Sequence, residues 1–158
     1  MMTASERTAA IAKIRELPEQ AAAAVKGLHD QQLDTPYGEG KWTSRQIIHH
    51  LADSHLNAFI RMKLIVTENY PTLKPYDQDA WAKTRDSLCP VESSLEILRG
   101  LHARWVDLLE SLPDSAWARA AYHPDNGKMA LEEFLKLYEE HGTHHLAQIT
   151  GLRARNGW

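Results

Sequence analysis

The sequence has only one cysteine, Cys89, in 158 residues, so no disulfide can form within the chain. It has no apolar run near the roughly 20 residues that a membrane-spanning helix needs. Its start, which includes Glu6 and Arg7, does not resemble a signal peptide. The formal net charge of −3 gives no basic surplus to attract nucleic acid. These absences predict a cytoplasmic protein that binds neither membranes nor nucleic acids.

Several catalytic signatures are missing as well. No G-x-S-x-G, P-loop or G-x-G-x-x-G occurs. The metalloprotease signature H-E-x-x-H requires a glutamate directly after its first histidine, and the residue after His141 is Gly142. Paired E-x-x-H motifs, which supply di-iron ligands in helical bundles, are also absent. These gaps argue against a protease and favour one metal ion over two.

The composition that is present, 43% hydrophobic and 25% charged, is typical of one globular domain, which we expect to span residues 1–158. Glycine and proline divide the chain into four long segments, which predict helices near residues 5–28, 43–69, 91–112 and 130–155. Pro18 should break or kink the first helix, and Thr43 with Gln46 forms a capping box for the second. A long connection over residues 70–90 should contain a short helix near Trp81. No convincing strand pattern appears, so the expected fold is all-α, a four-helix bundle.

Histidines provide the main chemical signal, because six of the nine fall in two short segments, residues 49–55 and 141–145. His141 and His145 are four residues apart, so on a helix their rings project from one face and can bind one metal ion. His144 could replace His145 on spacing alone. The apolar stripe favours His145, since it is formed by Phe134, Tyr138, His141, His145, Gln148 and Leu152.

A third ligand should come from a facing helix. His50 begins a polar stripe, continued by Ser54, Asn57 and Arg61, which lies beside the buried arc of its helix. His49 falls on the far side, and His55 lies inside the apolar arc, as expected of a hydrogen-bonded core histidine. The sequence therefore predicts a metal site made of His50, His141 and His145. The alternative is structural: an H-x-x-x-H pair can occur by coincidence, and Arg61 can pair with a carboxylate of another helix.

Five segments together resemble the DinB-like superfamily, and more closely its YfiT branch of metal-dependent hydrolases and bacillithiol transferases. They are residues 42–57, 74–77, 101–105, 122–124 and 141–145. The resemblance covers nearly the whole chain. It implies a four-helix bundle, often a homodimer, with zinc or nickel on three histidines, which correspond here to His50, His141 and His145. Gln148 stands where some members have another histidine.

Three neutral imidazoles leave a divalent ion its full charge and an open position, which suits Lewis-acid chemistry. The first hypothesis is a metal-dependent S-transferase that joins a bacillithiol-type thiol to an electrophilic small molecule. Asn57 and Arg61 would position anionic groups of the substrate. The second is a small-molecule hydrolase, with Asp53 or Glu140 as its base. The third is a non-enzymatic metal-binding stress protein.

Overall fold

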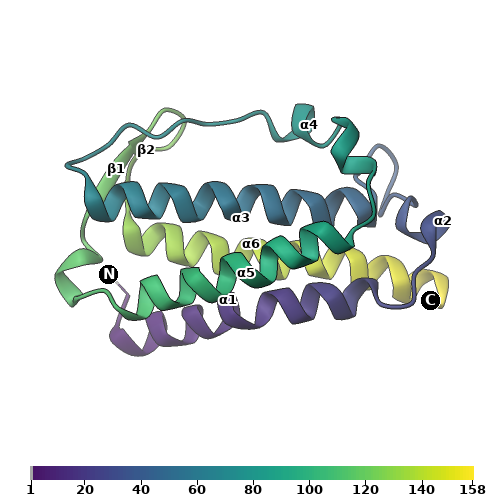
Figure 1. Ribbon diagram of the computed structural model, residues 1–158, viewed down its shortest axis with the longest axis horizontal. Coiled ribbons are helices and arrows are strands. Elements are labelled where there is room, and N and C mark those ends of the chain that lie inside the picture. The colour runs from purple at the N-terminus through teal and green to yellow at the C-terminus, as the bar shows by residue number, and fades with distance from the viewer. Residues whose placement is uncertain (1) are drawn as a thin grey trace.

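Four long helices packed side by side form the body of the protein (Figure 1). The computed structural model describes residues 2–158. The long helices are α1 (Ala4–Val25), α3 (Ser44–Thr67), α5 (Glu92–Glu110) and α6 (Leu131–Asn156). The shorter elements are α2 (Asp30–Leu33), α4 (Gln78–Trp81), η1 (Arg85–Leu88), η2 (Asp114–Ala116), β1 (Ala120–His123) and β2 (Gly127–Ala130). The prediction of a four-helix bundle is confirmed. None of the helices within residues 2–158 is long and apolar enough to cross a bilayer.

The long helices begin and end where local chemistry satisfies their free backbone groups. The capping box predicted for α3 is present, because the Thr43 hydroxyl accepts from the Gln46 amide N–H and the Gln46 side chain accepts from the Thr43 N–H. Thr3 and Glu6 form a second box at the start of α1. At the other end of the bundle, Gly157 adopts the left-handed conformation that ends α6.

Of the break or kink expected at Pro18, the break is absent, because α1 continues through this residue from Ala4 to Val25. A proline removes the N–H that would bond to the carbonyl four residues earlier, which here belongs to Ile14. That carbonyl finds another donor, because the His102 Nδ1–H of α5 lies 2.5 Å from it. The helix therefore continues through Pro18 with its freed acceptor satisfied by a neighbouring helix.

A short antiparallel hairpin, β1 and β2, precedes α6, although no strand was predicted. Its three-residue loop, residues 124–126, is followed by Gly127, the first residue of β2, whose positive φ of 72° lets the chain return into the strand. The H-P-D-N-G sequence is the signal that could have revealed it. The 68–91 connection runs back along α3 (Figure 1), and its Leu73 N–H donates to the Tyr122 carbonyl of β1. The hairpin and the connection thus cover one side of α3 and α6.

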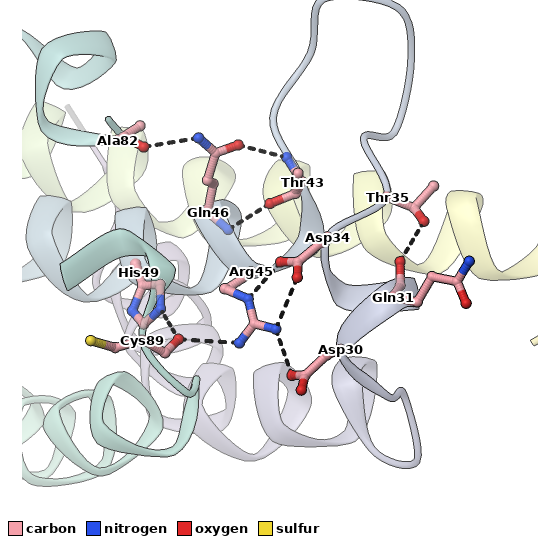
Figure 2. Close-up of polar contacts among 10 residues, drawn as sticks. All are labelled: Asp30, Gln31, Asp34, Thr35, Thr43, Arg45, Gln46, His49, Ala82 and Cys89. Atoms are coloured by element: carbon pink, nitrogen blue, oxygen red, sulfur yellow. Dashed lines mark hydrogen bonds and ion pairs between the residues drawn. The ribbon is translucent and has the colours of Figure 1, made fainter. Parts of the chain in front are cut away.

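The end of this connection is fastened to α3 by polar contacts (Figure 2). The buried Arg45 guanidinium contacts Asp34 at 2.6 Å, Asp30 at 2.7 Å and the Cys89 carbonyl at 3.2 Å. His49 lies beside it, with Nε2 2.9 Å from the same carbonyl and Nδ1 2.8 Å from Ser94 Oγ. The expectation that His49 faces away from the core is wrong, because the connection and α5 cover that side of α3.

The apolar core has two clusters, and a layer of histidines lies between them. One cluster surrounds Trp105 and Phe134, and the other surrounds Leu51 and Leu98. Each of the four long helices contributes residues to both clusters. At the division between them the structure buries polar rings, which belong to His55 (0% exposed) and His102 (1% exposed). Buried polar groups need hydrogen-bond partners, so this layer restricts how the helices can pack.

Candidate metal centre

Three histidine rings from two helices converge on one point. His50 of α3 and His141 and His145 of α6 each place a ring nitrogen within 4.8 Å of the others. Their ring centroids are separated by 5.2 Å, 4.8 Å and 4.5 Å. The structure thus brings together the three residues that the sequence singled out. His144 is exposed and lies outside this set, so the geometry favours His145 over His144, between which spacing alone did not decide.

The spacing of the nitrogens suits a single ion. His50 Nε2 and His141 Nε2 lie 3.2 Å apart. If each bound one ion at about 2.0–2.1 Å, the angle between the two bonds would be roughly 100°, close to tetrahedral. Burial adds to the fit, since His50 is 4% and His145 8% exposed. The residues present therefore fit a divalent metal with three imidazole ligands.

The protein environment keeps these histidines neutral at physiological pH. Burial, followed by the charge of His145, lowers the pKa of His50 to about 3. Burial, followed by the neighbouring His145 and His50, lowers the pKa of His141 to about 3. The pKa of His145 is also lowered by burial, against the opposing effect of its hydrogen bond to Gln148. Neutral imidazoles keep a lone pair free for a metal, so protons compete weakly with the ion.

Hydrogen bonds orient the two rings on α6. His145 Nδ1 lies 2.9 Å from Gln148 Oε1, and the amide nitrogen of Gln148 donates to His144 Nε2 at 2.9 Å. Because an amide oxygen only accepts, His145 donates through Nδ1 and its Nε2 is left to bind metal. His141 Nδ1 lies 3.3 Å from His55 Nε2 on α3. Such partners of the second ring nitrogen are a regular feature of histidines that bind metals.

A pocket of about 220 Å³ adjoins two of the three histidines, His50 and His141. Its lining includes His50, Arg61, Tyr76, His123, Tyr138 and His141. Arg61 is 9% exposed, donates to the Lys74 carbonyl at 2.6 Å and lies 5.9 Å from the Tyr76 ring centroid. Within residues 2–158, no carboxylate forms an ion pair with this guanidinium, so the alternative that paired it with another helix is wrong. A buried cation facing a pocket is a natural partner for an anionic group.

The other candidate residues lie elsewhere. Asn57 is half-buried, donates to the Asp53 carbonyl and does not line this pocket. Asp53 is half-buried, and burial followed by Asp86 raises its pKa. Glu140 is exposed and lines a separate groove between α1 and α6. Cys89 is exposed near the end of the 68–91 connection and does not line this pocket.

Sequence reasoning missed several residues around the site. The Trp42 ring packs against His50 at 4.6 Å and stacks on His145 at 6.0 Å, forming one wall. Tyr76 and Tyr138 form another part of the pocket, and burial raises the pKa of both phenols. His123 reaches the pocket from the hairpin. Tyr138 belongs to the stripe predicted for the last helix, whereas Trp42, Tyr76 and His123 lie outside α3 and α6, so no helical spacing links those three to the histidines.

The fold and site define a class: a four-helix bundle with a candidate three-histidine metal centre beside a small pocket. Residues 13–149 match the DinB superfamily. A Bacillus mycoides protein named "Putative metal-dependent hydrolase" is 48% identical over 148 residues, covering 94% of this chain and 86% of its own length. A Geobacillus kaustophilus protein with the same description is 51% identical over 151 residues, covering 94% and 84%.

Among solved structures, YfiT from Bacillus subtilis superposes with a TM-score of 0.97 at 44% identity. The match covers all of this chain and 91% of YfiT, which is described as a probable metal-dependent hydrolase with an unusual four-helix bundle topology. This chain therefore belongs to the DinB superfamily, and the predicted resemblance is confirmed. The prediction of a metal-dependent enzyme is confirmed, because these relatives are described as metal-dependent hydrolases.

Proposed function

We propose that this chain is a metal-dependent S-transferase that joins a low-molecular-weight thiol of the bacillithiol type to an electrophilic small molecule. The observation behind the proposal is a pocket lined by two of the three neutral imidazoles, His50 and His141, and by the buried Arg61 guanidinium, which forms no ion pair with a carboxylate of residues 2–158. His50, His141 and His145 would hold zinc or nickel. When bound, such an ion lowers the pKa of a thiol or water placed at its open position.

The residues of the chain divide the remaining work. The Arg61 guanidinium binds a carboxylate or similar anionic group of the thiol or its partner, and the rings of Tyr76 and Tyr138 exclude water from that part of the pocket. In the reaction, the thiol loses its S–H proton to solvent and a carbon–sulfur bond forms. The bond from that carbon to its leaving group breaks, and the leaving group departs with the electron pair.

The two carboxylates considered as the base of a hydrolase, Asp53 and Glu140, do not line the pocket beside the imidazoles. The lining does include His123 and Asp125, so a group that can accept a proton from water is present there as well. The names of the relatives also favour hydrolysis, so a metal-dependent hydrolase of a small molecule is the second candidate.

Metal analysis of purified variants tests the site first. His50→Ala, His141→Ala and His145→Ala should each lose most of the bound zinc or nickel, since each removes one of three ligands. His144→Ala is the matched control, because that exposed ring lies next to the site without joining it. If His144→Ala loses its metal while His145→Ala keeps it, the proposed ligand set is wrong.

Activity assays separate the candidate functions. The zinc- or nickel-loaded protein should conjugate monobromobimane with bacillithiol, releasing bromide, and His50→Ala should not. Hydrolysis of p-nitrophenyl acetate without thiol would support the hydrolase instead. Metal binding without turnover in either assay would support the third hypothesis, a non-enzymatic metal-binding protein.

Arg61 allows a sharper test of substrate recognition. Arg61→Gln should raise KM for a thiol that bears a carboxylate far more than for neutral 2-mercaptoethanol, because only the first offers an anion to the guanidinium. Equal changes for both thiols would contradict the assigned role. Substrate binding by Asn57 and assembly as a homodimer stay predictions, the second open to a light-scattering measurement of mass.

A further inference from the structure

A row of hydrogen bonds connects the metal centre to the far side of the bundle. His141 Nδ1 of α6 lies 3.3 Å from His55 Nε2 of α3. His55 Nδ1 lies 3.0 Å from His102 Nε2 of α5, and His102 Nδ1 lies 2.5 Å from the Ile14 carbonyl of α1. Each of the four long helices thus contributes one group. We call this row the histidine relay.

The direction of the relay follows from its last member. A carbonyl oxygen only accepts, so His102 must donate through Nδ1. A neutral imidazole has one N–H, which leaves His102 Nε2 with a lone pair that accepts from His55 Nδ1–H. By the same reasoning His55 Nε2 accepts from His141 Nδ1–H. The only ring nitrogen of His141 without a proton is then Nε2, the atom that faces His50 at 3.2 Å.

Pro18 explains why the Ile14 carbonyl is available. In an unbroken α-helix this oxygen would accept the N–H of residue 18, and a proline has none. The carbonyl is therefore a buried acceptor without a partner in its own helix, and His102 supplies the N–H that it needs. A proline that seemed a helix breaker in the sequence thus sets the end point of the relay.

The relay is buried enough to keep each ring neutral. His55 is 0% and His102 1% exposed. Burial lowers the pKa of His102 to about 4, against the raising effect of its bond to the Ile14 carbonyl. Burial, and next the neighbouring His102 and His141, holds the pKa of His55 well below 6.5. With one proton per ring, only one arrangement satisfies every hydrogen bond.

We propose that His55 and His102 are positioning residues, which fix His141 in the Nδ1–H tautomer and so present its Nε2 lone pair to the metal. The inference rests on the proposed metal site and adds a role for two residues that do not touch the ion. In this proposal α1 and α5 contribute to metal affinity, although neither helix provides a ligand. Partners of this kind change metal affinity by about 10–100-fold when removed.

The metal-free protein tests the tautomer without any need for metal binding. In protein labelled with 15N-histidine, the ring-nitrogen chemical shifts distinguish protonated from unprotonated nitrogens. We expect His141 to show a protonated Nδ1 and an unprotonated Nε2. In His55→Phe this preference should be lost, because Nδ1–H no longer has an acceptor. A wild-type His141 that has its proton on Nε2 would overturn the proposal, whether or not the protein binds zinc.

Zinc affinity, measured by competition with a chromophoric chelator, tests the consequence. His55→Phe should bind zinc 10–100-fold more weakly than wild type. His49→Phe is the matched control, since it removes a buried histidine with two hydrogen bonds from the same helix outside the relay. Equal losses in the two variants would mean that the effect is general destabilisation, and would overturn the proposal.

A second pair of variants acts one step farther from the metal. His102→Leu should lower zinc affinity, because His55 loses its acceptor and can turn its proton toward His141. His102→Gln should restore much of it, since the glutamine amide can accept from His55 and donate to the Ile14 carbonyl. Folding of each variant is checked by circular dichroism. Equal affinities of the folded leucine and glutamine variants would refute the relay.

Discussion

Gly142 of α6 packs closely against Leu17 of α1, directly after the proposed ligand His141. A Cβ at this position would lie 2.7 Å from Cδ1 and 2.9 Å from Cδ2 of Leu17. Carbon atoms in good contact are about 3.5–4.0 Å apart, so the two groups would overlap by roughly 0.8 Å. Leu17 is 4% exposed and precedes Pro18, so it has little room to move. We therefore predict that Gly142→Ala destabilises the protein although alanine favours helices.

Two opposing effects set the magnitude. Alanine in a helix interior gains about 1 kcal/mol over glycine, and overpacking a buried contact costs about 1–3 kcal/mol. The net loss should be about 1 kcal/mol, which lowers Tm by about 2–4 °C in a domain of this size. Urea and thermal unfolding of the metal-free protein measure it.

Gly100 of α5 provides the matched control, because it is exposed and a Cβ there meets nothing within 4 Å. Gly100→Ala should stabilise the protein by about 1 kcal/mol. Combining Gly142→Ala with Leu17→Ala should cost less than the sum of the two single changes, since the smaller side chain makes room for the new methyl group. If both glycine variants are stabilised equally, the close approach of α1 and α6 is wrong.

Three further predictions concern acid, metal and the Arg45 contacts. The pKa of His102 is about 4 in the folded protein, against 6.5 for a free histidine such as that of the unfolded chain. Below pH 6.5 the unfolded chain therefore binds more protons at this residue than the folded protein does. The free energy of unfolding should fall by roughly 3 kcal/mol from this group as pH drops from 6.5 to 4, and His102→Gln should flatten the urea-unfolding profile over that range. Zinc at about 100 times its Kd should add about 2.7 kcal/mol to the stability of wild type and nothing to His50→Ala, as calorimetry would show. Arg45→Met should lower the free energy of unfolding by about 2 kcal/mol, because it removes the hydrogen bonds to Asp30, Asp34 and the Cys89 carbonyl. An unchanged midpoint of urea denaturation would contradict this prediction.

Local pattern was enough to place the long helices, because glycine and proline punctuation and identifiable helix ends divide the sequence into four segments. The Thr43 and Gln46 capping box is an example, since its hydrogen bonds join residues three apart and depend on nothing distant. The break considered at Pro18 does not occur, and the hairpin was not predicted, for different reasons. The helix survives Pro18 because a residue 84 positions later supplies a donor, and the hairpin consists of strands too short to show a period.

The sequence by itself determined the helical class and the three histidines of the candidate site, because spacing along a helix defines which side chains share a face. Only the tertiary structure decided what surrounds them: the packing of the Trp42 ring against His50, the position of Arg61 in the pocket lining and the tautomer of His141. Those features join residues from different helices and from the 68–91 connection. Their geometry exists only after the helices have packed, since no local interaction brings such distant groups within hydrogen-bond range.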